Sequence, residues 1–245
     1  MGKSLPYTFA AALSRPGSAH EGIEDRFTIL DASNPVVRMA RRGAIFAVAD
    51  GVSSTDRADE AAEVACDHLE AFFKANRPAS EDLLLDVVEA SDAEVRMLNY
   101  GASTLAGIWV AQEAVRVFSL GDSSVYRVRG RELTRLNWKN PKQALHTYIG
   151  MGKNVRPSVE LFTHELRVGD VYLLMTDGVF AVFTEEELVS ALISTRDLLD
   201  FVAALEHRVD RGRPADDVTL LAVKVLGLEA NDEDLEVYVD LDLDD

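Results

Sequence analysis

Acids that border apolar stretches are the first chemically informative pattern in the sequence. Asp50, Asp122 and Asp177 each end an apolar run, in AIFAVAD, VFSLGD and VYLLMTD. Four further acids directly precede such a run: Glu24, Asp25, Asp216 and Asp217. A single Asp-Gly pair after a strand is usually a turn, because Asp bonds to its own backbone and Gly tolerates positive φ. The recurrence of acids at several strand ends instead favours one rigid acidic site.

A shared site of this kind would need positive charge. The motifs around Asp50, Asp122 and Asp177 contain no Lys or Arg, so mutual repulsion would raise the pKa values of the acids and destabilise the fold. Carboxylate oxygens, in a chain with one cysteine and five histidines, favour Mg²⁺ or Mn²⁺ over Zn²⁺. Two such ions activate a bridging water for in-line displacement at phosphorus. The acids therefore predict metal-assisted hydrolysis of a phosphoester.

The acids depend on the elements that carry them, and the expected strands come in runs. They cover 7–14, 26–30, 43–49, 103–111, 114–119, 123–129, 132–136, 158–166, 170–175 and 218–225. Tight turns at 112–113 and 130–131 indicate antiparallel hairpins. Helical spacing of apolar residues marks 56–75, 80–98 and 196–209, and a capping box of Thr184 and Glu187 opens another helix.

This order of elements predicts an α+β fold, because a doubly wound sheet would need strands and helices to alternate. We expect a four-layer αββα sandwich, in which two antiparallel sheets pack face to face with helix pairs on the outside. The absence of an internal repeat or a linker rich in Pro, Gly and Ser favours one domain over 5–228. Residues 229–245 form a separate acidic tail.

The tail has a regular pattern of its own. It holds nine acids and no Lys or Arg, and apolar residues alternate with polar ones from Leu235 to Asp244. A period of two is typical of a strand, so the tail is a candidate for an added strand at a sheet edge, of this chain or of a partner. The alternatives are a solvated tail and a pseudo-substrate that binds a basic patch.

Composition limits the classes of function. The 245 residues are 47% hydrophobic and 27% charged, with a net charge of −17, which disfavours binding to nucleic acid. No apolar run reaches the ~20 residues that cross a bilayer, and the first residues make a poor signal peptide. The single cysteine, Cys66, excludes an internal disulfide. We therefore expect a cytoplasmic protein that binds neither nucleic acid nor membrane.

The motifs GxxHxxxED, ADG, GASTL, GDSSVY, TDG and DDVT follow one another from Gly17 to Val223. Each is weak alone, but the ordered set resembles the metal-dependent protein phosphatases of the PPM, or PP2C, family of bacterial type. The resemblance implies the αββα sandwich and the hydrolysis of phosphoserine and phosphothreonine in proteins. It also implies two core Mn²⁺ or Mg²⁺ ions, a third in bacterial members, and phosphoprotein substrates of a cognate Ser/Thr kinase in signalling.

The resemblance also implies roles for individual residues. Asp50 matches the aspartate that bridges the two core ions, with the carbonyl of Gly51 as a further ligand. Asp177 and Asp216 match the remaining acids of the binuclear site. These three aspartates are therefore the expected core of the catalytic site.

Three further acids match positions around this core. Glu24 and Asp25 match the acids that hold metal-bound waters. Asp122 resembles the position that, with the aspartate of the TDG motif, holds the third ion. Asp217 stands where the family usually has Asn, and it adds an acid that we expect to act through its neighbours.

His20 is the main departure from the family pattern, because most members have an Arg there that grips the substrate phosphate. We expect His20 to contact the phosphate or, as an imidazolium, to protonate the departing serine oxygen. The alternative is a solvent-exposed loop histidine. None of the departures removes a core ligand, so an active enzyme is expected.

Other cations could assist phosphate binding. The stretch 138–157 aligns with a flap that flanks the active site in the family, and its Lys139, Lys142, Lys153 and Arg156 are candidate contacts for a phosphopeptide. Arg15 is another candidate contact. Solvated loop side chains are the alternative.

Two other functions compete with the protein phosphatase. One is a catalytically weak relative that binds phosphoproteins through the same surface, against which the retention of Asp50, Asp177 and Asp216 argues. The other is a hydrolase of small phosphate esters. The sequence does not specify the oligomeric state.

Overall fold

The computed structural model describes residues 5–19, 22–98, 101–137 and 146–229. In this part of the chain ten strands form two five-stranded antiparallel sheets, with the orders β1-β10-β9-β6-β7 and β2-β3-β4-β5-β8. The strands are β1 (Tyr7–Arg15), β2 (Arg26–Leu30), β3 (Ala44–Ala49), β4 (Leu105–Ala111), β5 (Ala114–Leu120), β6 (Ser124–Arg129), β7 (Glu132–Arg135), β8 (Glu160–Glu165), β9 (Val171–Met175) and β10 (Val218–Gly227).

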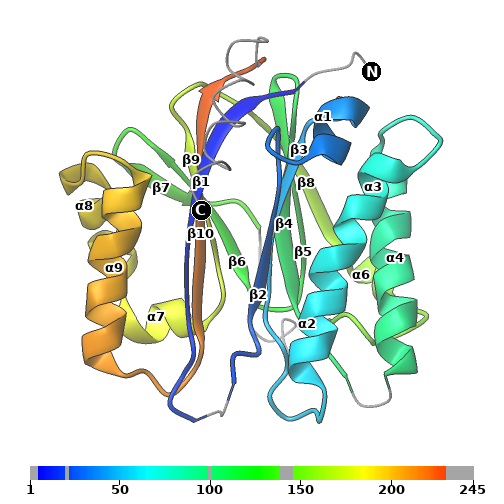
Figure 1. Ribbon diagram of the computed structural model, residues 1–245, viewed down its shortest axis with the longest axis horizontal. Coiled ribbons are helices and arrows are strands. Elements are labelled where there is room, and N and C mark those ends of the chain that lie inside the picture. The colour runs from blue at the N-terminus through cyan, green and yellow to red at the C-terminus, as the bar shows by residue number, and fades with distance from the viewer. Residues whose placement is uncertain (1–4, 20–21, 99–100, 138–145, 230–245) are drawn as a thin grey trace.

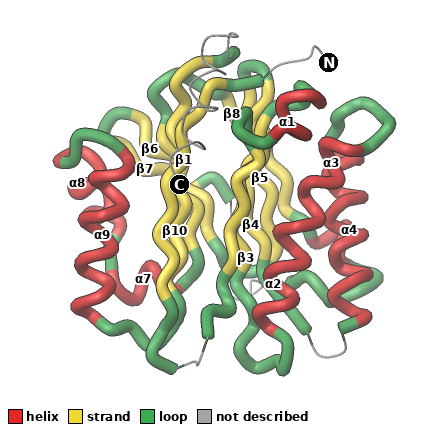
Figure 2. The backbone as a smooth tube through the Cα atoms, viewed as in Figure 1, coloured by secondary structure: helices red, strands yellow, loops and turns green. Residues whose placement is uncertain are grey.

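Helices cover the outer face of each sheet, so the molecule has four layers (Figures 1 and 2). The β2–β8 sheet is covered by α2 (Ala58–Asp67), the 3-10 turn His68–Glu70, α3 (Ala71–Lys74) and α4 (Glu81–Met97). The β1–β7 sheet is covered by α7 (Gly178–Val182), α8 (Glu185–Ser194) and α9 (Leu198–Gly212). Two short helices, α1 (Pro35–Ala40) and α6 (Val155–Ser158), complete the described elements.

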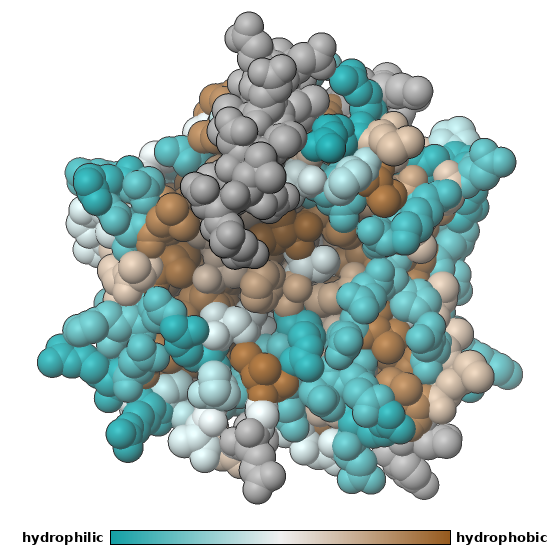
Figure 3. Space-filling view, viewed as in Figure 1, coloured by the Kyte–Doolittle hydropathy of each residue, from teal (hydrophilic) through white to brown (hydrophobic). Residues whose placement is uncertain are grey.

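Burial on both faces explains the continuous apolar sequence of β3. All six of its residues are buried, although alternate side chains point to opposite faces of a strand. Ala44, Phe46 and Val48 pack in the core between the two sheets. Ile45, Ala47 and Ala49 pack in the core beneath α2, α3 and α4. In the space-filling view, hydrophilic side chains dominate the outer faces on both sides, and apolar ones are visible mainly between them (Figure 3).

Local signals set the helix ends. Thr184 and Glu187 form the reciprocal capping box that the sequence predicted at the start of α8. Ser80 caps α4 and Asp197 caps α9 through their side-chain oxygens. The residues Leu198, Phe201, Val202, Leu205 and Val209 give α9 one buried face, which lies against β1.

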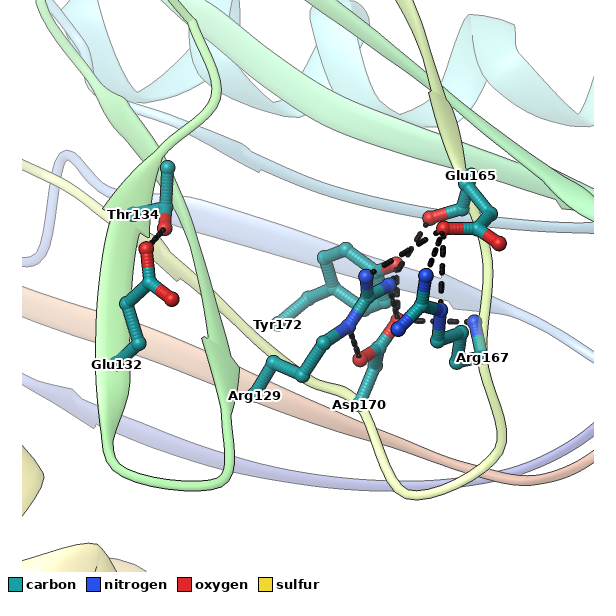
Figure 4. Close-up of polar contacts among 7 residues, drawn as sticks. All are labelled: Arg129, Glu132, Thr134, Glu165, Arg167, Asp170 and Tyr172. Carbon is teal, nitrogen blue, oxygen red and sulfur yellow. Dashed lines mark hydrogen bonds and ion pairs between the residues drawn. The ribbon is translucent and has the colours of Figure 1, made fainter.

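Near the start of β9, Arg129 forms an ion pair with the buried Asp170 within one sheet and also contacts the other sheet. Asp170 is 1% exposed and accepts two hydrogen bonds from Arg129, at 2.7 and 2.8 Å. The backbone N–H of Arg167 and the hydroxyl of Tyr172 also donate to Asp170 (Figure 4). The same Arg129 donates to the carbonyl oxygen of Glu165, at the end of β8 in the other sheet. This network fastens β6 and β9 to β8 at one end of the sandwich.

The predicted fold class is confirmed, and each of the ten predicted strands is present with ends within two residues of those expected. The helix expected over 56–75 is divided into α2, a 3-10 turn and α3. The sequence analysis did not anticipate α1, α6 or α7, which have six residues or fewer. Among the described helices, none combines the length and apolarity required to cross a membrane. Residues 230–245 of the expected tail lie outside the described part.

Candidate functional site: an acidic cavity at the strand ends

Four of the predicted acids line a single cavity of about 810 Å³. Asp50 follows β3, Asp122 lies between β5 and β6, Asp177 follows β9, and Asp216 precedes β10. Gly51 lines the same cavity. The sheets thus bring together side chains that are distant in the sequence, as the pattern of acids at strand ends predicted.

Thr104 and Ser103 fix the backbone of Asp50. The N–H of Asp50 donates to Oγ1 of Thr104 at 2.9 Å, and the carbonyl of Asp50 accepts from the N–H of Thr104 at 2.8 Å. The hydroxyl of Ser103 donates to the same carbonyl at 3.0 Å, and Ser123 is hydrogen-bonded to Thr104 at 2.7 Å. These hydroxyl residues belong to the GASTL and GDSSVY motifs, but the sequence analysis gave them no role in positioning Asp50.

Asp217 holds the segment that carries Glu24 and Asp25. Its carboxylate accepts from the N–H of Gly17 and from the N–H of Glu24, each at 2.6 Å, and from the N–H of Asp25 at 3.4 Å. Asp217 is 4% exposed, so these bonds are shielded from water. The residue therefore acts through the backbone of its neighbours.

Gly178 makes the close approach of two strand ends possible. A Cβ atom at this position would lie 2.0 Å from the carbonyl oxygen of Asp217. The turn after Asp177 can therefore pack against the segment before β10 only with glycine here. This contact places Asp177 beside Asp216.

Asp25 is 3% exposed and is not among the residues that line the cavity. Its carboxylate accepts a hydrogen bond from the hydroxyl of Thr176 at 2.8 Å. The pKa of Asp25 is raised to about 7, mainly by burial and also by the charges of Asp217 and Asp216, against the opposing effect of hydrogen bonds that include the one from Thr176. Thr176, the residue before Asp177, was not identified from the sequence.

The carboxyl group of Asp50 has a strongly perturbed pKa. Burial raises the pKa of Asp50 to about 9, and the charges of Asp25, Asp177, Asp216 and Asp217 contribute in the same direction. The acids are thus close enough to repel one another. Within the described residues, however, no three His, Cys, Asp or Glu side chains are placed as a cage around one metal ion.

The cations predicted to contact phosphate differ in whether the structure describes them and in what they contact. His20, Lys139 and Lys142 lie outside the described residues. Arg15 forms ion pairs with Glu206 and Asp210 of α9, which engage its guanidinium.

Two cations of the 138–157 stretch are described. Arg156 binds Asp82, Asp86 and Glu89 of α4, and Lys153 is exposed but does not line the cavity. A different cation, Arg96 of α4, does line it. The sequence analysis missed Arg96 because it belongs to no motif.

The αββα sandwich with acids at its strand ends defines a class of phosphatases, and the comparisons with known proteins agree. Residues 30–218 match the model of the family described as protein phosphatase 2C. The chain belongs to this family and is a protein serine/threonine phosphatase by class, which confirms the resemblance found in the sequence. No curated protein matches the sequence.

Solved structures of bacterial phosphatases have the same fold. The serine/threonine phosphatase Stp1 from Staphylococcus aureus has a TM-score of 0.78 at 17% identity, over 93% of this chain and 98% of that one. The Mycobacterium tuberculosis phosphatase PstP/Ppp has a TM-score of 0.72 at 21% identity, over 89% and 99%. The catalytic domain of PstP in complex with two manganese ions has a TM-score of 0.72 at 23% identity, over 89% and 98%.

Proposed function

We propose that this protein hydrolyses phosphoserine and phosphothreonine in proteins, with two Mn²⁺ or Mg²⁺ ions bound in the acidic cavity. The observation that carries the proposal is the convergence of Asp50, Asp177 and Asp216 on one cavity, where burial and the charges of neighbouring acids raise the pKa of Asp50. Membership of the protein phosphatase 2C family supports the reaction class.

The donor set suits hard divalent cations. Carboxylate and carbonyl oxygens are the ligands that Mg²⁺ and Mn²⁺ prefer, and Mg²⁺ commonly keeps several waters while one or two carboxylates bind it. A site of this kind needs no cage of three acids around each ion. Asp50, the Gly51 carbonyl, Asp177 and Asp216 would hold the two core ions, and Asp122 with Asp177 would hold a third.

Bound ions would supply an activated water and would neutralise negative charge on the phosphoryl group. The chain's own contribution is to position ligands. Thr104 and Ser103 fix the backbone of Asp50, and Asp217 fixes the backbone of Glu24 and Asp25, which would orient waters around the ions. We propose that His20 contacts the substrate phosphate or protonates the leaving oxygen.

The substrates would be phosphorylated proteins, the products of a Ser/Thr kinase that this enzyme opposes in cytoplasmic signalling. The net charge of −17 argues against nucleic acid as a partner. The complex of the PstP catalytic domain with manganese supports the choice of Mn²⁺ for the first assays.

The test is hydrolysis of an aryl phosphate and of a phosphothreonine peptide with Mn²⁺, with EDTA and with the variant Asp50→Asn. We expect activity only with the metal and loss of most of that activity in the variant. Activity without metal, or full activity of Asp50→Asn, would contradict the proposal. Comparison of the phosphopeptide with free phosphoserine distinguishes a protein phosphatase from a hydrolase of small esters, and binding without turnover would indicate the catalytically weak relative.

A further inference from the structure

The acidic cavity contains one positively charged side chain among the described residues that line it. Five aspartates line it: Asp50, Asp56, Asp122, Asp177 and Asp216. Arg96, in the last turn of α4, is the single Lys, Arg or His of this lining. The cation comes from the helical layer, whereas the predicted metal ligands come from the strand ends. The positively charged side chain and the predicted metal ligands therefore lie on different walls of the cavity.

The guanidinium of Arg96 is available to a ligand. Within the described part of the chain it forms no hydrogen bond or ion pair, and the residue is exposed. Other arginines of this layer are engaged: Arg57 with Glu60, Arg77 with Asp86, and Arg156 with three acids of α4. Of the aspartates that the structure describes in the cavity lining, none forms an ion pair with Arg96.

The surroundings of Arg96 hold it at the cavity. One turn earlier on α4, the buried Asp92 accepts hydrogen bonds from the N–H groups of Gly150 and Gly152, at 2.7 and 3.0 Å. A Cβ atom at Gly152 would lie 3.3 Å from Nε of Arg96, so the guanidinium rests against this backbone. Gly150 and Tyr148 of the same loop line the cavity beside Arg96.

We propose that Arg96 binds an anionic group of the substrate that flanks the phosphorylated residue, and that it gives the enzyme a preference for acidic or multiply phosphorylated sequences. This inference depends on the proposed function for its substrate. The planar guanidinium binds carboxylate and phosphate through two parallel hydrogen bonds. A protein with a net charge of −17 repels an acidic peptide, so an available cation at the cavity has a large effect on which peptides bind.

A flanking group fits better than the reacting phosphate. Under the proposed function, Asp50, Asp177 and Asp216 would hold the ions that bind the reacting phosphate, and these residues lie at strand ends. Arg96 is on the wall that α4 and residues 147–150 form. A cavity of about 810 Å³ is in the size range that accommodates a drug-sized ligand, so it has room for a phosphorylated residue and a neighbouring side chain.

The experiment compares wild-type protein, Arg96→Gln and Arg96→Lys on three substrates with Mn²⁺. The substrates are an aryl phosphate, a phosphothreonine peptide with neutral flanks, and the same peptide with Asp or a second phosphothreonine beside the reacting residue. For Arg96→Gln we expect KM for the acidic peptides to rise about tenfold with little change in kcat, and no change on the other two substrates. KM for the acidic peptides should rise less with Arg96→Lys, because lysine keeps the positive charge but lacks the planar guanidinium with its paired N–H donors.

Arg131→Gln is the matched control. Arg131 is an exposed arginine at the turn between β6 and β7, and it does not line the cavity. This variant should behave as the wild type on all three substrates. An equal loss on all three substrates with Arg96→Gln, or unchanged kinetics, would overturn the inference. Loss on the Asp peptide alone or on the doubly phosphorylated peptide alone would support it and identify the anion.

A binding assay separates this inference from the proposed function. The acidic peptides, labelled with a fluorophore, are titrated with wild-type protein and with Arg96→Gln in EDTA, and anisotropy reports binding. Weaker binding to Arg96→Gln than to wild type and Arg131→Gln supports the inference even if no peptide is hydrolysed with Mn²⁺. Equal binding to all three proteins overturns it, whatever the outcome of the hydrolysis assays.

Discussion

The carboxylate of Asp217 accepts a 2.6 Å hydrogen bond from the backbone N–H of Glu24, which lies 193 positions earlier in the chain. The other oxygen of the same carboxylate accepts from Gly17, also at 2.6 Å. Asp217, which directly precedes β10, thus holds the first acidic motif in place. An acid at position 217 suits this role, because both of its side-chain oxygens accept hydrogen bonds.

Asp217→Asn should loosen the segment around Gly17 and Glu24. An asparagine has one acceptor oxygen, so one of the two backbone N–H groups loses its partner, at a cost of about 1–3 kcal/mol for a buried donor. We expect faster hydrogen exchange at those two amides and a lower Tm. Unchanged exchange at both amides would show that the carboxylate does not hold the segment.

Asp50→Asn should stabilise the protein in EDTA at pH 8. The folded protein keeps the Asp50 proton up to a pKa of about 9, whereas the unfolded chain releases it near its ordinary value of 3.8. Between these values the unfolded state binds fewer protons, so this group lowers the free energy of unfolding as the pH rises. Denaturant unfolding in EDTA at pH 5 and pH 8 measures the effect.

The variant should gain more stability relative to wild type at pH 8 than at pH 5, by more than about 1 kcal/mol. Addition of Mn²⁺ should reverse the order, because the proposed ion site would bind Mn²⁺ in the folded wild type and stabilise it. A variant less stable than wild type at pH 8 in EDTA would contradict the assigned repulsion.

Thr104→Val should weaken metal activation. The substitution removes the oxygen that accepts from the N–H of Asp50 and that bonds to Ser123. Loss of a group that orients a metal ligand commonly costs 10-fold to 100-fold in metal affinity or activity. We therefore expect the Mn²⁺ concentration for half activation to rise by about tenfold or more. Thr104→Ser keeps the hydroxyl and should retain most of the affinity; equal loss in both variants would argue for a packing effect.

Asp170→Asn should reduce stability without changing the chemistry. Burial alone would raise the pKa of Asp170, but hydrogen bonds from Arg129, the Arg167 backbone and Tyr172 lower it overall. Arg129 keeps 26% of its side chain exposed, so loss of the charged partner Asp170 should cost about 1–3 kcal/mol. Asp170 and the proposed metal ligand Asp177 lie just beyond opposite ends of β9. We expect a lower Tm with kcat close to wild type at a temperature where the variant is folded.

The free energy of unfolding of Asp170→Asn should depend on pH differently from that of wild type. Because the folded pKa of Asp170 is depressed, its contribution to stability is present above the unfolded pKa and is lost as the pH falls through the folded pKa. The difference in unfolding free energy between wild type and Asp170→Asn should therefore shrink as the pH falls below about 4. A constant difference at all pH values would point to packing instead.

The sequence predicted the elements with strong local signals. Alternating or continuous apolar runs marked every strand, and the Thr184–Glu187 box marked the start of α8. The convergence of Asp50, Asp122, Asp177 and Asp216 also followed from their common place at strand ends.

The contacts that organise the site could not be predicted in the same way. Thr104 bonds to Asp50 across 54 positions and Asp217 to Glu24 across 193, and no local pattern encodes such a contact. Arg96 was missed because only the three-dimensional structure shows that it lines the cavity. The roles of His20 and of the acidic tail remain predictions, since both lie outside the described residues.

The position of β10 has a consequence for how the protein is made. This strand is the last of those that the structure describes, yet it lies between β1 and β9. During synthesis on the ribosome β1 emerges early, whereas its neighbour β10 emerges only after nearly the whole domain. Asp216 and Asp217 emerge just before β10. A nascent or prematurely terminated chain that stops before Asp216 therefore lacks one of the proposed metal ligands and the strand that follows it, so phosphatase activity should begin only after synthesis of the domain is essentially finished.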